Sequence, residues 1–214
     1  MKTLDWYFDF ISPYSYLQNA VLSRVAPLAQ IRRRPILFGG LLTHWGHLGP
    51  AEIPPKRDWT FQHCVWLAAR AGIPLRMPAM HPFNPLPLLR LSIALGNTAE
   101  TVNRLFDFVW VAGHVPTESD AWQALLADCG VREADLQADA VKQALRDAGA
   151  DALATGVFGV PSAVVDGHCF WGFEATDMLI DYLKGSLRFD DPAMTAALAM
   201  PVGPMRPQVV KAAA

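Results

Sequence analysis

A serine hydroxyl stands at residue 12, where the pattern of a β-strand gives way to the pattern of a helix. Over residues 4–10, apolar side chains alternate with more polar ones, which is the period of a strand with one apolar face. Ser12 is a good helix N-cap, and Pro13 follows at a position where its missing N–H costs nothing. The start of a helix favours an anion because free backbone N–H groups point at it. Either Ser12 only caps this helix, or its hydroxyl also binds an anion.

Composition and charge exclude several classes of function. The 214 residues are 52% hydrophobic and 18% charged, so the chain can bury a sizeable core. The net charge of −2 argues against a nucleic-acid partner, and the short basic run Arg32–Arg34 indicates a solvated strand edge. No apolar run is long enough to cross a membrane, and no signal-peptide pattern precedes the first strand. We therefore expect neither a nucleic-acid nor a membrane partner.

The cysteines and histidines do not have the spacing of a metal or disulfide site. Cys64, Cys129 and Cys169 are scattered and form no C-x-x-C pair. The six histidines show no paired ligand spacing, so we expect no metal centre. An odd number of scattered cysteines is typical of a reducing, cytoplasmic setting in which thiols are buried as small apolar residues.

The order of the expected elements indicates an α/β fold with an insertion. Strand, helix and strand come first, then a long connection and a block of helices, and finally two strands and a helix. Without the block, this is the order of a thioredoxin-like sheet. We assign residues 1–40 and 150–188 to that domain, 41–149 to an inserted helical domain and 189–214 to a tail without periodicity. The expected strands are 3–10, 31–38, 162–165 and 168–171; the connection is 41–55; the expected helices are 13–28, 58–72, 84–95, 98–111, 119–130, 133–148 and 176–184.

In a thioredoxin-type fold, the end of the first strand and the start of the first helix hold the active pair, normally C-x-x-C. Residues 12–15 read Ser-Pro-Tyr-Ser, so dithiol exchange is excluded there because a thiolate is its nucleophile. The second half of such a site is a cis-proline loop before the third strand, and Val160-Pro161 is the candidate. The alternative is that Pro161 simply begins a strand in the trans form.

Three segments together resemble the 2-hydroxychromene-2-carboxylate isomerase family. They are FDFISPYSYL at residues 8–17, FGVPS at 158–162 and FWG at 170–172. This family is related to the kappa-class glutathione transferases, within the DsbA-like branch of thioredoxin folds. The resemblance spans roughly residues 4–185, including the helical insertion.

The resemblance implies a glutathione-dependent cis–trans isomerase. It would convert 2-hydroxychromene-2-carboxylate, or a related aromatic catabolic intermediate, to trans-o-hydroxybenzylidenepyruvate by reversible addition of the glutathione thiolate. Ser12 would be catalytic and would donate its O–H to that thiolate. The glutathione backbone would lie along Val160 and Pro161. The family also implies a small aromatic carboxylate as substrate and a homodimer.

Further glutathione contacts follow from the resemblance residue by residue. Lys56 falls where the family tends to have a lysine, in the loop before a helix, and would face a carboxylate. His47 falls where Gly-Asn is common, and Asn84 may be explained by a helix-cap role alone. Glu174-Ala175 replaces a frequent Asp-Arg pair, so Glu174 would still accept from an ammonium group while the arginine is lost.

Three tryptophans are candidates for an aromatic substrate pocket. They are Trp45, Trp110 and Trp171, although the helical position of Trp110 favours core packing. Two other functions stay open: a kappa-like glutathione transferase, which keeps the adduct, and a non-catalytic thioredoxin-like binding module. A serine hydrolase is disfavoured because the sequence has no Gly-x-Ser-x-Gly motif.

Overall fold

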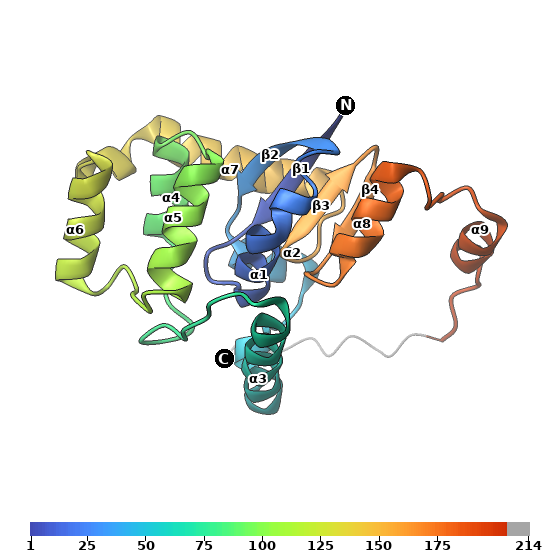
Figure 1. Cartoon of the computed structure of the whole chain (residues 1–214), viewed down its shortest axis with the longest axis horizontal. Coiled ribbons are helices and arrows are strands. Elements are labelled where there is room, and N and C mark those ends of the chain that lie inside the picture. The colour runs from blue at the N-terminus through green and yellow to red at the C-terminus, as the bar shows by residue number, and fades with distance from the viewer. Residues whose placement is uncertain (205–214) are drawn as a thin grey trace.

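A four-stranded mixed sheet lies at the centre of the computed structural model, which describes residues 1–204 (Figure 1). The strand order is β2-β1-β3-β4, with β1 parallel to β2 and antiparallel to β3, and β3 antiparallel to β4. A small mixed sheet interrupted after its second strand by helices was the predicted arrangement. The strands are β1 (Lys2–Phe8), β2 (Ala29–Pro35), β3 (Ser162–Val165) and β4 (His168–Trp171).

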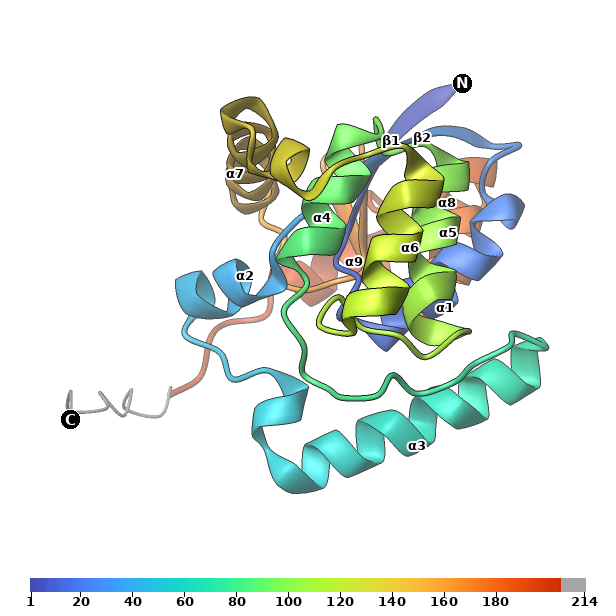
Figure 2. The same cartoon turned by 90° about the vertical axis from the view of Figure 1, so that its left-hand side faces the viewer.

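Helices cover both faces of this sheet (Figures 1 and 2). α1 and α8 pack on one face and α7 on the other, while α3 runs past α1. In residues 1–204, no helix has the length and apolar character needed to cross a membrane. The helices are α1 (Pro13–Val21), α2 (Phe38–Trp45), α3 (Pro54–Ala71), α4 (Leu86–Ala94), α5 (Ala99–Trp110), α6 (Ser119–Cys129), α7 (Asp139–Ala154), α8 (Ala175–Lys184) and α9 (Pro192–Leu198), with short 3-10 turns at Leu22–Arg24, Pro50–Glu52 and Glu133–Gln137.

The central strand β1 is buried on both faces. Trp6 and Phe8 belong to the larger core beneath α1 and α8, and their rings stack with centroids 4.4 Å apart. Tyr7 points to the opposite face, where it joins a smaller core with Ala152 of α7 and Leu41 of α2. Successive side chains of β1 therefore lie in two different cores, whereas the sequence indicated a strand with a single apolar face.

The connection predicted at residues 41–55 was wrong in two places. α2 begins at Phe38 and runs through Gly39 and Gly40, and a 3-10 turn forms at Pro50–Glu52. The two glycines disfavour a helix by roughly 1 kcal/mol each relative to alanine. Their effect is opposed by a cap from another element, because the Asp9 carboxylate accepts the Phe38 N–H at 2.8 Å.

Several helix boundaries and the tail also differ from the prediction: α1 ends at Val21 rather than near residue 28, and α7 begins at Asp139 rather than near residue 133. α3 begins at Pro54 rather than near residue 58, because prolines fit the first turn of a helix. α7 continues to Ala154 through Gly149. In the tail, α9 is a helix capped by Asp191, whereas no periodic structure was expected there. The predicted tail also includes residues 205–214, which lie outside the described part of the chain. The domain boundaries proposed from the sequence stay a prediction.

The hairpin predicted at Asp166-Gly167 is confirmed. Both residues have positive φ, 51° and 80°, which is the backbone of a two-residue turn that matches strand twist. It brings β4 back along β3 so that Ser162 pairs with Trp171.

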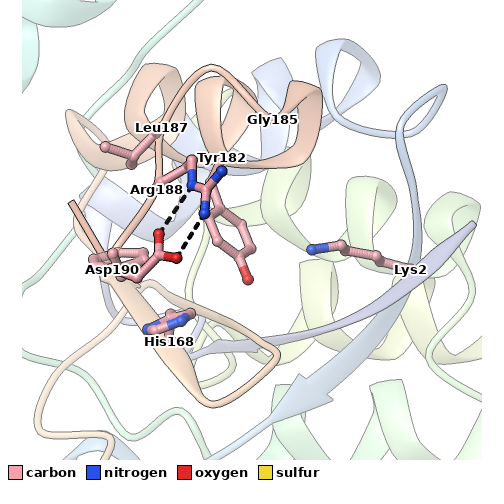
Figure 3. Close-up of a pocket in the computed structure, with 8 residues that line it drawn as sticks. Lys2, His168, Tyr182, Gly185, Leu187, Arg188 and Asp190 are labelled. Atoms are coloured by element: carbon pink, nitrogen blue, oxygen red, sulfur yellow. Dashed lines mark hydrogen bonds and ion pairs between the residues drawn. The ribbon is translucent and has the colours of Figure 1, made fainter.

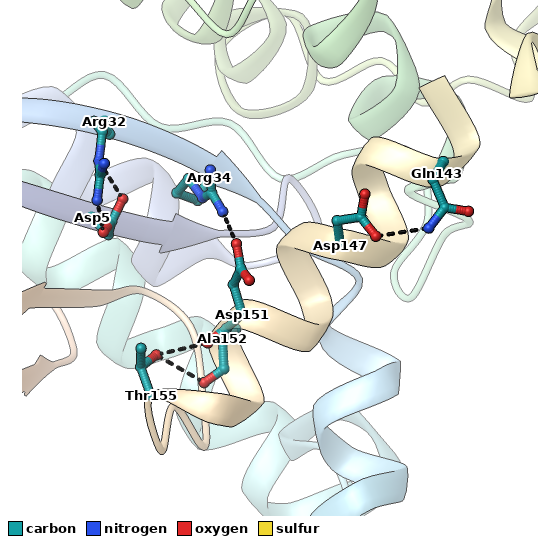
Figure 4. A network of polar contacts seen from close by, with 8 residues as sticks. All are labelled: Asp5, Arg32, Arg34, Gln143, Asp147, Asp151, Ala152 and Thr155. Atoms are coloured by element: carbon teal, nitrogen blue, oxygen red, sulfur yellow. Dashed lines mark hydrogen bonds and ion pairs between the residues drawn. The ribbon is translucent and has the colours of Figure 1, made fainter. Parts of the chain in front are cut away.

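The arginine run lies on β2, at the edge of the sheet, as predicted. Arg32 forms a bidentate ion pair with Asp5 of β1, and Arg34 pairs with Asp151 of α7 (Figure 4). Each pair is largely solvent-accessible, so its contribution to folding is about 0–1 kcal/mol. These contacts neutralise Arg32 and Arg34, while Arg33 forms no ion pair with a residue of the described part.

Gln18 is a buried polar residue that joins three elements. Its Oε1 accepts the Trp6 indole N–H at 2.7 Å, and its Nε2 donates to the Gly172 carbonyl at 2.9 Å and to the Thr176 hydroxyl at 3.2 Å. The side chain is fully buried. Gln18 thereby fixes α1 against β1 and against the turn that leads into α8.

We predict that Gln18→Leu destabilises the protein by about 2–4 kcal/mol, because it leaves buried donors and acceptors without partners. Urea unfolding measures the change. Gln30→Leu, at an exposed position of β2, is the matched control and should change stability by less than about 0.5 kcal/mol. Equal stability of the two variants would show that the Gln18 contacts contribute nothing net.

Candidate functional site

Ser12 occupies the predicted strand–helix junction and caps α1. Its Oγ accepts the Ser15 N–H at 3.2 Å, and its own N–H donates to the Asp9 carbonyl at 3.1 Å. The residue is buried, with 7% of its surface exposed. Within residues 1–204, the structure gives the Ser12 O–H no acceptor. The cap role is therefore real, and it leaves one donor free for an anion at the start of a helix.

The Val160-Pro161 peptide bond is cis, as predicted. The Pro161 carbonyl accepts the Gly172 N–H at 2.9 Å, which fixes the loop to the end of β4. β1 and β3 pair with Tyr7 opposite Ser162, so the chain after β1 and the chain before β3 leave the sheet at the same end. This register brings the Ser12 loop and the Val160-Pro161 loop to one edge of the sheet.

Asp9 holds the Ser12 loop from inside the protein. Its carboxylate is fully buried and accepts two backbone N–H groups, Ile11 at 3.1 Å and Phe38 at 2.8 Å. Burial raises the pKa of Asp9 to about 7, although the two N–H groups act in the opposite direction. Asp9 was not predicted to be a site residue, because in the sequence it is only one polar position of the strand pattern.

Two more buried side chains fix the carbonyl groups of the same loop. Trp110 Nε1 donates to the Phe10 carbonyl at 2.9 Å, and His81 Nε2 lies 2.8 Å from the Ile11 carbonyl. A carbonyl only accepts, so His81 carries its proton on Nε2. Burial lowers the pKa of His81, which favours this neutral form. Trp110 is fully buried, as expected for core packing, and His81 was not identified from the sequence.

Three of the other predicted glutathione contacts are exposed side chains. Lys56 is exposed in the first turn of α3, not in a loop, and His47 is exposed just after α2. Asn84 is exposed and accepts the Leu86 N–H at 3.1 Å, but it lies one residue before the N-cap of α4, which is Pro85 rather than the expected Asn84. Among the described residues, no hydrogen bond or ion pair joins these three side chains to Ser12 or Val160. Their glutathione roles stay predictions.

Glu174 lies close enough to act on the site through its charge. It is exposed immediately before α8, and its carboxylate contributes to raising the pKa values of Tyr14 and Cys64, for which burial is the larger cause. Tyr14 lies two residues after Ser12, and its hydroxyl is 2.9 Å from His63 Nδ1 of α3. Glu174 therefore faces the same end of α1 as Ser12.

Exposed aromatic rings border the cis-proline loop. Trp171 is 55% exposed and meets Phe158 edge to face, with ring centroids 5.0 Å apart. Trp45 is 42% exposed and donates its indole N–H to the Val157 carbonyl at 3.0 Å. Trp45 and Trp171 were predicted to line an aromatic pocket, and the structure adds Phe158 to the aromatic residues beside the cis-proline loop. Such half-exposed rings can cover an aromatic ligand.

The described residues offer neither a metal centre nor a free cationic pocket near Lys2. Between residues 1 and 204, no cluster of three or more His, Cys, Asp or Glu side chains could hold a metal ion. A surface hollow of about 690 Å³ lies around Lys2 and α8 (Figure 3). It is at the opposite end of β1 from Ser12, and its cations are already paired, Arg188 with Asp190 and Lys2 with Asp166.

We predict that Asp9→Asn removes a pH dependence of stability between about pH 4 and pH 7. In this window the folded protein retains the Asp9 proton that the unfolded chain releases, so stability falls as pH rises, by up to about 1.4 kcal/mol per pH unit from this group. Above pH 7 the contribution is constant. Urea unfolding at several pH values tests this, with exposed Asp120→Asn as control. An unaltered profile in Asp9→Asn would refute the raised pKa.

We predict that Gly159→Ala displaces Trp171. A Cβ at residue 159 would lie 2.6 Å from Trp171 Nε1, so the indole must move. In ¹⁵N NMR spectra, the indole signal of Trp171 should shift while that of Trp110 stays in place. Gly39→Ala is the matched control because its Cβ would meet nothing within 4 Å. An unmoved Trp171 signal would contradict the close packing.

The comparisons with known proteins agree with this arrangement. The family described as DSBA-like thioredoxin domain matches residues 3–184. A 2-hydroxychromene-2-carboxylate isomerase of Sphingobium xenophagum is 31% identical over 192 residues, covering 85% of this chain and 98% of the relative. Glutathione S-transferase kappa 1 of Rattus norvegicus is 27% identical over 206 residues, covering 86% of this chain and 91% of the relative.

Among solved structures, a 2-hydroxychromene-2-carboxylate isomerase superimposes with a TM-score of 0.74 at 24% identity, covering 93% of this chain and all of the other. This match supports the fold. The resemblance inferred from three short segments is thus confirmed along most of the chain. The chain belongs to the DSBA-like thioredoxin domain family and, within it, to the 2-hydroxychromene-2-carboxylate isomerase family.

Proposed function

We propose that this protein is a glutathione-dependent cis–trans isomerase of an aromatic carboxylate. The substrate is 2-hydroxychromene-2-carboxylate or a close relative, and the product is the trans-o-hydroxybenzylidenepyruvate type of isomer. Glutathione is regenerated in each turnover and is a cofactor. Family membership supports an isomerase or transferase activity.

One observation carries the proposal, the free O–H donor of Ser12. Its oxygen is occupied as the cap of α1, and its proton has no acceptor in the described residues. A thiolate placed at the start of α1 would accept this hydrogen bond and would also lie in the favourable field of the helix. Both effects lower a thiol pKa and increase the fraction of thiolate near neutral pH.

The cis-proline loop fits the peptide part of glutathione. Neither the N–H nor the carbonyl of Val160 has a backbone partner among the described residues. An extended peptide can pair with such free groups as an added strand would. In the proposal, Lys56 approaches a glutathione carboxylate and Glu174 approaches its ammonium group, while His47 and Asn84 border the same ligand.

When bound, glutathione supplies a thiolate whose reversible addition to a conjugated carbon turns a double bond into a rotatable single bond. Ser12 keeps the sulfur ionised before addition and stabilises it again on elimination. The half-exposed rings of Trp45 and Trp171 cover the aromatic part of the substrate. A hydroxyl suits this cycle better than a thiol, because a cysteine at position 12 would also attack oxidised glutathione, releasing one glutathione thiolate and trapping the other as a mixed disulfide.

A kappa-like glutathione transferase is the second candidate, since relatives of that name match most of the chain. The two activities differ in whether the adduct is eliminated or released. Mass spectrometry of the products distinguishes them, because only the transferase yields a stable conjugate. The homodimer implied by the family and the cytoplasmic location expected from the cysteines are further proposals, and sedimentation analysis tests the first.

The test of function is an absorbance time course with purified protein and 2-hydroxychromene-2-carboxylate, with and without reduced glutathione. Isomerisation that requires glutathione in catalytic amounts supports the proposal. The absence of any turnover, together with no glutathione binding by calorimetry, would favour the non-catalytic binding module instead.

We predict that Ser12→Ala lowers kcat by about 100-fold, as expected for loss of one hydrogen-bond donor to a developing or stored negative charge. The pH profile should shift upward because the bound thiol loses a stabilising donor. Ser15→Ala is the matched control. The Ser15 hydroxyl is buried without a partner, and its backbone N–H, which binds Ser12, remains in the variant. Equal loss in both variants would assign the effect to the helix rather than to Ser12.

A further inference from the structure

An apolar groove lies between α2, α4 and α7, which converge on the side of the molecule that Figure 2 shows. Its volume is about 420 Å³. Gly149 of α7 adds to the open space, because nothing lies within 4 Å of where its Cβ would be. The floor consists of leucine side chains: Leu37, Leu41, Leu86, Leu145 and Leu153.

Three cations and no anion complete the lining of this groove. They are Arg90 of α4 and Lys142 and Arg146 of α7. Elsewhere the described part of the chain pairs many of its arginines with aspartates, as at Arg24, Arg104 and Arg132. None of the three groove cations lies within 4 Å of a carboxylate of residues 1–204. The groove therefore combines an apolar floor with an uncompensated positive rim.

The polar contacts of these cations are with neutral groups. Arg90 donates to Gln137 Oε1 at 3.0 Å, and its Nε is buried without a partner. Arg146 donates twice to Gln143 Oε1, at 3.1 and 2.6 Å. Arg90 is half-buried with a neutral partner and therefore carries a desolvation cost that an anion would offset, whereas Arg146 is exposed.

The charge pattern of α7 separates its two sides. Lys142, Leu145, Arg146, Gly149 and Leu153 follow one another mostly at three- and four-residue steps, which places them on one helix face. Asp151 pairs with Arg34 of β2 (Figure 4), and the exposed Asp147 accepts from Gln143. Neither of these carboxylates lines the groove, whereas Lys142 and Arg146 do.

We propose that this groove is a second binding site, for a small apolar carboxylate. The hydrocarbon part lies on the leucine floor, and the carboxylate lies at the rim among Arg90, Lys142 and Arg146. The ligand class follows from charge complementarity: the apolar floor selects a hydrocarbon body, and the three cations select a single anionic head. The site is built from α2, α4 and α7 and does not depend on the activity proposed for Ser12.

Octanoate is the probe, and 1-octanol is the neutral control of the same chain length. Titration is followed by NMR of the full chain with ¹³C-labelled leucine methyl groups. We expect saturable shifts at Leu41, Leu145 and Leu153 with octanoate and affinity at least about tenfold lower for octanol, because a charge-assisted contact is lost. Octyl phosphate separates a carboxylate site from a phosphate site, and tighter binding of the phosphate would overturn the assignment.

Substitution of the rim then tests the charge contribution. The double variant Lys142→Gln, Arg146→Gln should weaken octanoate binding about tenfold and leave octanol binding unchanged. Lys184→Gln, which removes one cation at the end of α8, is the control and should bind octanoate as the parent does. Ser12→Ala should also bind octanoate as the parent does, since the groove is separate from the junction.

Three results would each overturn the proposal. They are the absence of saturable shifts at the groove leucines, equal affinity for octanoate and octanol, and unchanged octanoate binding in the double variant. Loss of octanoate binding in Ser12→Ala would instead place the probe at the junction and refute a separate site. A failed isomerase assay would not affect these outcomes, because the titration needs no turnover.

Discussion

The structure around Ser12 depends on how three buried side chains hold a short loop. Asp9 accepts the Ile11 N–H, Trp110 donates to the Phe10 carbonyl, and His81 donates to the Ile11 carbonyl. With the Ser12 N–H bound to the Asp9 carbonyl, the loop backbone between β1 and α1 has few groups left to satisfy. The hydroxyl of Ser12 is therefore placed by its surroundings and has little freedom to turn toward another acceptor.

This holding network joins the sheet domain to the helical insertion. Asp9 belongs to the end of β1, while its second partner, Phe38, begins α2; His81 and Trp110 come from the helical block. The insertion therefore supplies structure to the junction as well as a covering layer. α2 and α5 each hold the loop before Ser12 through one hydrogen bond, to Asp9 and to Phe10, so the helical block is part of the structure that positions Ser12.

The features that the sequence predicted correctly are the local ones. Ser12-Pro13 and Asp166-Gly167 carry their geometry within two residues, and Val160-Pro161 followed once the order of elements was known. The features that were missed depend on distant partners. α2 was read as a loop because its cap is Asp9, 29 residues earlier, and Gln18 looked like one polar position on a helix face although its partners are 12, 154 and 158 residues away.

The charge around Ser12 also depends on burial and on distant partners, so it was the hardest property to predict. A carboxylate next to this loop would oppose a thiolate, since both would be negative and close together. Asp9 avoids part of this conflict by being buried: its pKa is raised to about 7, so much of it is protonated near neutral pH. The Asp9 carboxyl group therefore holds the loop through its hydrogen bonds. Because it is buried, it also carries less negative charge than an exposed aspartate would. The start of α1 then sets the local field, and the free hydroxyl of Ser12 adds to it.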